Sequence, residues 1–265
     1  YLPMVSTTSI IGHKLLLASL TEDHAKGNVA HAYLFAGPRG VGKFTVAKWF
    51  ASQLLTEGME KEIAERAQQQ INRMMYSDLS VIDKLWMEDM QEDMEILGRS
   101  STISQEHRKK AKAKTDSIGI EDIRLLQERL HETASGKYKC CLIRKVERMH
   151  DEAVNSLLKI LEEPPEGVVF ILTTESLAQL LPTLISRTRL LRFTRVADRE
   201  VLPLLSGLDD QDQRFIARVA QGAPGIARTL ANDPEALRKE RTFAGNASAF
   251  WRASTLYERL KFLTP

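Results

Sequence analysis

The stretch HAYLFAGPRGVGKFT, residues 31–45, decides the fold of this chain. It starts as a short apolar run, passes through three glycines and a lysine, and continues into TVAKWFASQLL, where apolar residues recur at helical spacing. A strand, a glycine-rich loop and a helix in this order form the context of the phosphate-binding pattern G-x-x-x-x-G-K-S/T. Backbone N–H groups at the start of the helix would face the phosphate. The predicted phosphate ligands are Gly37, Gly40, Gly42 and Lys43.

The loop departs from the pattern at the position that holds magnesium. Phe44 replaces the residue whose hydroxyl coordinates the ion, and Thr45 stands one position late, about 100° further round the helix. The apolar run CCLI is followed by Arg144 and Lys145, where such folds carry metal-binding acids. These two cations are also explained as solvated surface charges, which would equally leave a metal unbound. We expect no metal site and no ordinary Mg-ATP hydrolysis, although the loop's N–H groups could still hold ATP or an anion.

Composition points to a globular protein. The chain has 265 residues, 43% of them hydrophobic, and a formal net charge of +2, so no bulk field favours nucleic acid or membrane. Its apolar runs are far shorter than the ~20 residues of a membrane span, and the N-terminus lacks a signal-peptide layout. We expect a cytoplasmic protein. Cys140 and Cys141 are adjacent in a predicted strand, where they point to opposite faces, so we expect unpaired core residues and no zinc site.

Three apolar runs predict strands: HAYLFAG, CCLI and VVFILTT. Helical periodicity lies between them and before them, for example over residues 10–25 and 151–161. Strands that alternate with helices indicate an α/β fold with a central parallel sheet covered by helices. After residue 196 only helical patterns and turn signals follow. We therefore predict an α/β domain over residues 1–196 and a smaller helical domain over residues 197–265.

Residues 58–118 fit this scheme less well. Part of the segment has helical periodicity, whereas its second half is polar and predicts an insertion that is helical or disordered. We expect residues 99–117 to be mobile, since they lack apolar anchors. The basic run HRKKAKAK, residues 107–114, is explained either as a solvated loop or as a contact with DNA phosphates.

Three longer stretches carry a family resemblance: HAYLFAGPRGVGK, ERMHDEAVNSLLKILEEPPEGVVFILTT and LLPTLISRTRLLRF. They resemble the bacterial DNA polymerase III clamp loader, the family of gamma/tau and delta-prime subunits. The resemblance covers roughly residues 10–56 and 118–232. It implies an AAA+ P-loop fold followed by a small helical lid domain. Within the family gamma/tau subunits hydrolyse ATP, whereas delta-prime is commonly degenerate. In gamma/tau-like members acids follow the strand that matches CCLI, where this chain has Arg144 and Lys145, and GAPGIAR is similar to delta-prime.

The resemblance also assigns roles to individual residues. Thr174 matches a polar sensor residue at the end of its strand, and Gly225 falls where active members carry a second sensor arginine. Ser186 and Arg187 resemble the family's Ser-Arg-Cys motif, with Thr188 in place of cysteine. In the family this arginine reaches the ATP of the next subunit in the ring, a task that suits its fork of donors. A surface arginine at a helix end is the other explanation of Arg187.

Two departures from the family concern whole segments. The four-cysteine zinc module expected after the phosphate-loop helix is replaced by AERAQQQINRMM, so we expect no zinc. The helical collar domain of the family would begin near WRASTLYERLKFLTP, where this sequence ends. We interpret that stretch as the start of a truncated collar.

Three hypotheses for function remain. The first is a delta-prime-like subunit that needs no cofactor, acts as a scaffold and donates Arg187 to a neighbouring ATPase. Its partners would be the gamma/tau and delta subunits, the sliding clamp and primed DNA, near the nucleoid and with no membrane. The second is an active gamma/tau-type ATPase, favoured by Lys43 and Thr174. The third, a small-molecule phosphoryl transferase, explains the loop but not NSLLKILEEPP.

Overall fold

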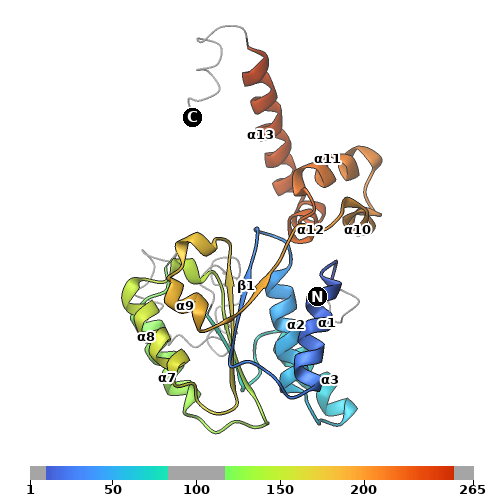
Figure 1. The fold of residues 1–265 in the computed structure, drawn as a ribbon. Coiled ribbons are helices and arrows are strands. Elements are labelled where there is room, and N and C mark those ends of the chain that lie inside the picture. The colour runs from blue at the N-terminus through green and yellow to red at the C-terminus, as the bar shows by residue number, and fades with distance from the viewer. Residues whose placement is uncertain (1–9, 83–116, 254–265) are drawn as a thin grey trace. The chain divides into compact units, whose positions relative to one another are not determined.

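The computed structural model describes residues 10–82 and 117–253 (Figure 1). The chain divides into two compact units with a boundary between Thr194 and Arg195. The basic run 107–114 and the segment 99–117, except for its last residue, lie outside the described residues. Most of the stretch that resembles a collar also lies outside them.

A five-stranded parallel sheet forms the centre of the first unit, in the order β2-β3-β4-β1-β5. The three middle strands are buried at every residue, which is why they read as continuous apolar runs in the sequence. The strands are β1 (Ala32–Ala36), β2 (Leu79–Ile82), β3 (Lys139–Ile143), β4 (Val168–Thr174) and β5 (Arg189–Arg192).

The two edge strands were not predicted from the sequence. β2 lies inside the segment interpreted as an insertion, 58–118, so residues 79–82 belong to the sheet instead. β5 follows the Ser186-Arg187 motif and pairs with β1. Each has four residues, and polar side chains interrupt its apolar pattern. Such short edges give no clear periodicity, and pairing with a buried neighbour decides their conformation.

Helices cover both faces of the sheet, as Figure 1 shows. On one side lie α1 (Lys14–Ala25), α2 (Lys43–Leu55) and α3 (Lys61–Asn72). On the other lie α7 (Ile120–Leu130), α8 (Asp151–Glu162) and α9 (Pro182–Ser186). Short 3₁₀ turns, η3 (Val146–Arg148) and η4 (Leu177–Gln179), follow β3 and β4. The predicted alternation of strands and helices, and with it the α/β fold, is confirmed.

The core explains the adjacent cysteines. Cys140 and Cys141 are both buried and free, as predicted, and Cys141 packs in the cluster that the sheet forms with α7 and α8. Burial raises the pKa of both thiols well above the usual value. These residues therefore act as small apolar core groups.

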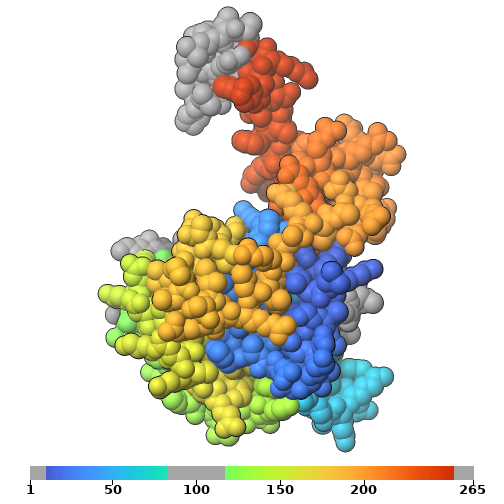
Figure 2. All heavy atoms as spheres, viewed as in Figure 1, coloured from blue at the N-terminus to red at the C-terminus, as the bar shows by residue number. Residues whose placement is uncertain are grey.

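Segments far apart in the sequence meet at the β5 edge. In the space-filling view the yellow-to-gold segment of α9 and β5 lies against the blue N-terminal segment (Figure 2). The guanidinium of Arg189 forms an ion pair with the carboxylate of Asp23 and donates to Ser19 Oγ at 3.0 Å. The Tyr33 hydroxyl donates to the same carboxylate at 3.3 Å. Burial, the largest cause, raises the pKa of Tyr33 to about 12.

The second unit consists of helices around a small apolar core of its own. That core includes Val201, Leu205, Ile216 and Leu230. Its described elements are α10 (Asp198–Val201), η5 (Leu202–Leu205), α11 (Asp210–Ala220), α12 (Pro224–Asn232) and α13 (Pro234–Arg252). Of the helices in the described residues of both units, none is long and apolar enough to cross a membrane.

Candidate functional site

The predicted phosphate loop joins β1 to α2. Gly40 and Gly42 have positive φ angles of 76° and 105°, a conformation that favours glycine, and Gly42 lies immediately before the first turn of α2. Gly37 lies so close to Phe193, the residue after β5, that a Cβ atom at position 37 would be 2.3 Å from the carbonyl oxygen of Phe193. The glycine spacing therefore reflects both backbone conformation and close packing. Because the residue before α2 is Gly42, no side chain caps the start of this helix.

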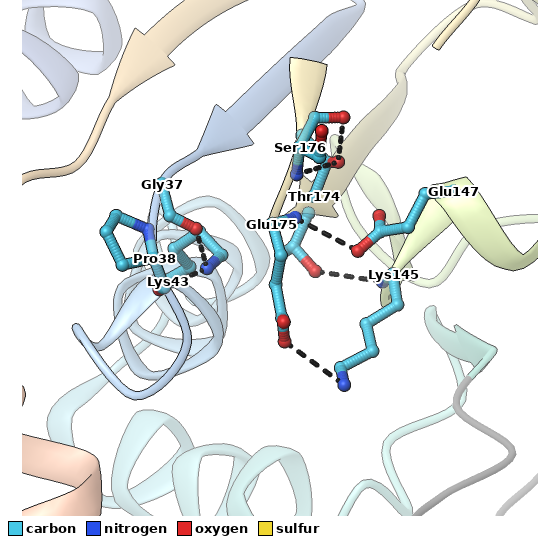
Figure 3. Close-up of polar contacts among 9 residues, drawn as sticks. Gly37, Pro38, Lys43, Lys145, Glu147, Thr174, Glu175 and Ser176 are labelled. Carbon is cyan, nitrogen blue, oxygen red and sulfur yellow. Dashed lines mark hydrogen bonds and ion pairs between the residues drawn. The ribbon is translucent and has the colours of Figure 1, made fainter. Parts of the chain in front are cut away.

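Lys43 is bent back onto its own loop. Its Nζ donates to the carbonyl oxygens of Gly37 at 2.6 Å and Pro38 at 2.7 Å, and the residue is only 8% exposed (Figure 3). Burial lowers the pKa of Lys43 to about 8, against smaller opposing effects of the acids Glu175 and Glu147. The lysine of the pattern is thus in place, and its ammonium donates to two backbone carbonyls of the loop.

Phe44 stands at the sequence position where the pattern has a hydroxyl. Its ring centroid lies 5.0 Å from the guanidinium carbon of Arg144 and 5.5 Å from Nζ of Lys48, both within reach of a cation–π interaction. The neighbouring Thr45 is half-buried in the first turn of α2. An aromatic face between two cations offers no oxygen to a divalent ion, which needs several hard ligands.

The residues that follow β3, beside Phe44, are cations, whereas a metal site would have carboxylates there. β3 ends at Ile143, and Lys145 follows in a left-handed conformation with φ 57°. Its backbone N–H donates to Thr173 Oγ1 at 3.1 Å, and its Nζ lies 3.1 Å from the carboxylate of Glu175 (Figure 3). The backbone N–H of Glu175 donates in turn to Glu147 at 3.0 Å. Two carboxylates are therefore present, but they are bound to Lys145 and to backbone.

The donor set does not fit magnesium. Position 44 is aromatic and positions 144 and 145 are cationic, so the ligands of a nucleotide-bound ion are absent from the loop and the strand end. In residues 10–82 and 117–253 no group of three or more His, Cys, Asp or Glu side chains could hold a metal ion.

Sequence reasoning missed the two acids of this contact network, Glu147 and Glu175. Glu175 directly follows the strand VVFILTT, and Glu147 stands two residues after Lys145. Their position after two neighbouring parallel strands was the available signal, because the carboxyl ends of such strands meet at one edge of the sheet.

Thr174, the last residue of β4, lies beside the loop. It pairs in register with Ala36, and its carbonyl oxygen accepts a hydrogen bond from the N–H of Gly37 at 3.2 Å. Its hydroxyl donates to the carbonyl of Ser176 and accepts from the N–H of Ser176, both at 3.1 Å (Figure 3). The fully buried side chain thus closes a turn after β4.

The Ser186-Arg187 motif lies at the end of α9, on the other side of the sheet from α2 (Figure 1). Ser186 Oγ donates to the carbonyl of Thr183 at 3.1 Å. The guanidinium of Arg187 donates to the same carbonyl at 3.0 Å and to the carboxylate of Glu162 at 2.6 Å. The structure therefore places this pair in a separate cluster from Lys43 and Thr174.

Gly225 is exposed in the first turn of α12, in the second unit. Without a side chain it offers no cation to a phosphate. The helix starts with Pro224, which suits the first helical position because it has no N–H to leave unpaired.

Comparison with protein families gives one match over most of the chain. The model of the family described as DNA polymerase III, delta subunit, matches residues 12–197. The DNA polymerase III gamma subunit of Buchnera aphidicola is 26% identical over 231 residues, which are 84% of this chain and 56% of that relative. The DNA polymerase III tau subunit of Escherichia coli is 30% identical over 187 residues, 67% of this chain and 24% of that relative. The chain thus spans about half or less of these relatives.

Comparison with solved structures supports the fold. The RuvB Holliday junction branch migration motor of Thermotoga maritima has a TM-score of 0.54 at 17% sequence identity, with coverage of 87% of this chain and 64% of that chain. At this identity the likeness shows the fold alone, which is the AAA+ arrangement of a parallel sheet covered by helices.

Proposed function

Because the chain belongs to the DNA polymerase III clamp-loader family, and matches the model of its delta subunit, we propose that it is a delta-prime-like subunit of the replicative clamp loader. In this proposal the chain hydrolyses no ATP. It is a scaffold that donates Arg187 as an arginine finger to the ATP site of a neighbouring subunit.

The proposal rests on the residue types at the metal position, where an aromatic ring and cations replace a hydroxyl and acids. The ring of Phe44 lies against Arg144 where a hydroxyl would hold magnesium, and Lys145 is paired with Glu175 where an acid would stand. Restoring a metal site would require at least two changes of residue type, at positions on two different elements. Phosphoryl transfer by this fold depends on the metal to neutralise developing charge. The site therefore lacks what hydrolysis requires.

The contacts of Lys43 bear on what the loop can hold. In an active loop its ammonium would meet the terminal phosphates of ATP. Here it donates to Gly37 and Pro38, so an incoming anion must replace two hydrogen bonds that are already made. We propose that no cofactor is required, and that the loop's N–H groups can hold ATP or a simple anion without magnesium.

The choice of Arg187 as the finger is supported by comparison with Arg189. The guanidinium of Arg189 is paired with Asp23, whose side chain is only 10% exposed, and it anchors the edge of the sheet. Arg187 is paired with Glu162, whose side chain is 51% exposed. Separating Arg189 from its partner would leave a nearly buried charge unpaired, which is costly. The pair formed by Arg187 is more exposed, so its guanidinium can reach a further partner without leaving a buried charge unpaired.

The partners in this proposal are the gamma/tau and delta subunits of the loader, the sliding clamp and primed DNA. The protein would work in the cytoplasm, near the nucleoid. A role for zinc is not part of the proposal, since the described residues that replace the expected zinc module form α3 (Lys61–Asn72).

The second candidate is an active gamma/tau-type ATPase. One observation favours it: the curated relatives carry the names gamma and tau. The glycines and lysine of the loop are also retained. Under this alternative Lys43 leaves its loop carbonyls and binds ATP, and a metal is held without the usual ligands.

One experiment separates the two candidates. The loader is rebuilt with the Arg187→Ala subunit or with the Lys43→Ala subunit, and DNA-stimulated ATP turnover and clamp loading are measured. Arginine fingers contribute ~10³ to 10⁵ in rate where each is the sole such group. We expect a smaller loss for Arg187→Ala, because the ring has several ATP sites, and almost none for Lys43→Ala.

The isolated chain provides the control, because it should show no magnesium-dependent turnover. Arg187→Lys keeps the charge but not the planar fork, so it should restore little of the lost rate. A Lys43 variant more damaging than the Arg187 variant would establish the active ATPase instead.

A further inference from the structure

We propose that Glu162 is a positioning residue for Arg187. The carboxylate at the end of α8 holds the guanidinium in the orientation in which it meets the neighbouring subunit's phosphate. This inference rests on the proposed function, because it assigns a partner residue to the proposed arginine finger.

Two acceptors fix the guanidinium. Arg187 Nη2 donates to Glu162 Oε1 at 2.6 Å, and Nη1 donates to the carbonyl oxygen of Thr183 at 3.0 Å. These contacts involve different nitrogens, so they determine the plane of the guanidinium as well as its position. A charged acceptor also makes the first contact the stronger of the two.

The acceptors themselves are held by short, well-defined elements. α8 ends at Glu162, and Pro164 and Pro165 follow within three residues, so the helix cannot continue. α9 begins with Pro182 and contains Thr183. The carboxylate and the carbonyl therefore come from two helix ends that the sequence fixes independently, and Arg187 bridges them.

The arrangement leaves donors for a ligand. A guanidinium has five N–H donors. Two of them are used in contacts with the described residues, and the side chain remains 32% exposed. The remaining N–H groups can donate to phosphate oxygens without loss of the two existing hydrogen bonds. A finger held in this way loses little side-chain freedom when it engages, whereas a free arginine would lose about 2 kcal/mol of rotamer entropy.

A purely structural role would look different. Glu162 and Arg187 are both partly exposed, with side-chain exposures of 51% and 32%, and exposed ion pairs contribute little to stability. Loss of the pair should therefore leave folding and ring assembly unchanged. If the pair serves to position the finger, its loss should instead reduce the rate of the neighbouring subunit's reaction.

The test uses the loader rebuilt with Glu162→Ala, Glu162→Gln or Glu163→Ala subunits. Glu163 is the adjacent exposed acid and provides the matched control, since it has the same charge and lies outside the contact. We expect Glu162→Ala to lower the maximal rate of DNA-stimulated ATP turnover by about three- to tenfold, within the ~100-fold that a misplacement of about 1 Å can cost.

Four further results are expected. The KM for ATP stays unchanged in Glu162→Ala, because the nucleotide is held by the neighbouring subunit. Glu162→Gln keeps an acceptor oxygen and recovers most of the rate, and Glu163→Ala behaves as wild type. In an Arg187→Ala background, adding Glu162→Ala changes turnover by less than about twofold, since the two residues act as one unit.

Several outcomes would overturn the inference. A rate raised by Glu162→Ala would show that the carboxylate restrains the arginine, and equal effects of Glu162→Ala and Glu163→Ala would show a general effect of charge. A full additional loss in the Arg187→Ala background would show that Glu162 acts independently. If Arg187→Ala itself has no effect, the proposed function fails. If Arg187→Ala lowers turnover and Glu162→Ala does not, only the positioning role fails.

Discussion

Replacement of Lys43 by methionine should change how the stability of the protein depends on pH. Burial lowers the pKa of Lys43 to about 8 from its ordinary value of 10.5. The folded protein therefore releases this proton at lower pH than the unfolded chain does. Between these two pKa values the unfolded state binds more protons, so the free energy of unfolding of the wild type rises with pH. Lys43→Met removes that contribution.

The magnitude follows from the two pKa values. The charged lysine destabilises the folded state by about 3 kcal/mol at pH near 7, and this falls to about 1 kcal/mol at pH near 10. The free energy of unfolding of the wild type, relative to Lys43→Met, should therefore rise by about 2 kcal/mol across this window. The acids Glu147 and Glu175 and the cations Arg144 and Lys145 face the same site, and their effects are contained in this pKa.

The assay is denaturant unfolding of wild type and Lys43→Met at a series of pH values. Lys61, an exposed lysine on α3, provides the control, because Lys61→Met reports the loss of a solvated lysine in the same window. A stability difference between wild type and Lys43→Met that does not change with pH would refute the reasoning. Sulfate provides a second arm: an anion in the loop would stabilise the ammonium and flatten the pH dependence.

A glycine substitution and a thiol-labelling experiment test the packing. Gly222 has φ 74°, and a Cβ there would lie 2.2 Å from the carbonyl oxygen of Val196, so Gly222→Ala should destabilise the second unit by more than about 2 kcal/mol in thermal unfolding. Gly207→Ala is the control, because nothing lies within 4 Å of its added Cβ, and a comparable loss there would contradict the argument. Cys140 and Cys141 are buried with raised pKa values, so a thiol reagent should label them only on unfolding. Rapid labelling of the native protein would contradict this.

The candidate site could be predicted from the sequence only in part. The loop residues Gly37, Gly42 and Lys43 are where the pattern places them, and Thr174 pairs beside them. The turn of Lys43 onto the carbonyls of Gly37 and Pro38 could not be predicted, since the same residues in an active loop face phosphate.

The sequence by itself determined the parallel sheet and its phosphate loop. Runs such as VVFILTT, residues 168–174, are apolar throughout because both faces of a central strand are covered, and this signal is local. The glycines at 40 and 42 are local as well, because their own φ angles require them. The expectation that this site binds no magnesium rests on position 44 and on positions 144 and 145 alone, because a ring and two cations offer no ligand to the ion.

Only the tertiary structure decided the contacts between distant segments. Arg187 and Glu162 are 25 residues apart, and nothing in either motif indicates that they meet. The pairing of Lys145 with Glu175 likewise depends on β3 and β4 being neighbours in the sheet. The edge strand β2 (Leu79–Ile82) became visible only through its pairing with β3. In each case the sequence supplies the two groups, and the order of the strands and the packing of the helices bring them together.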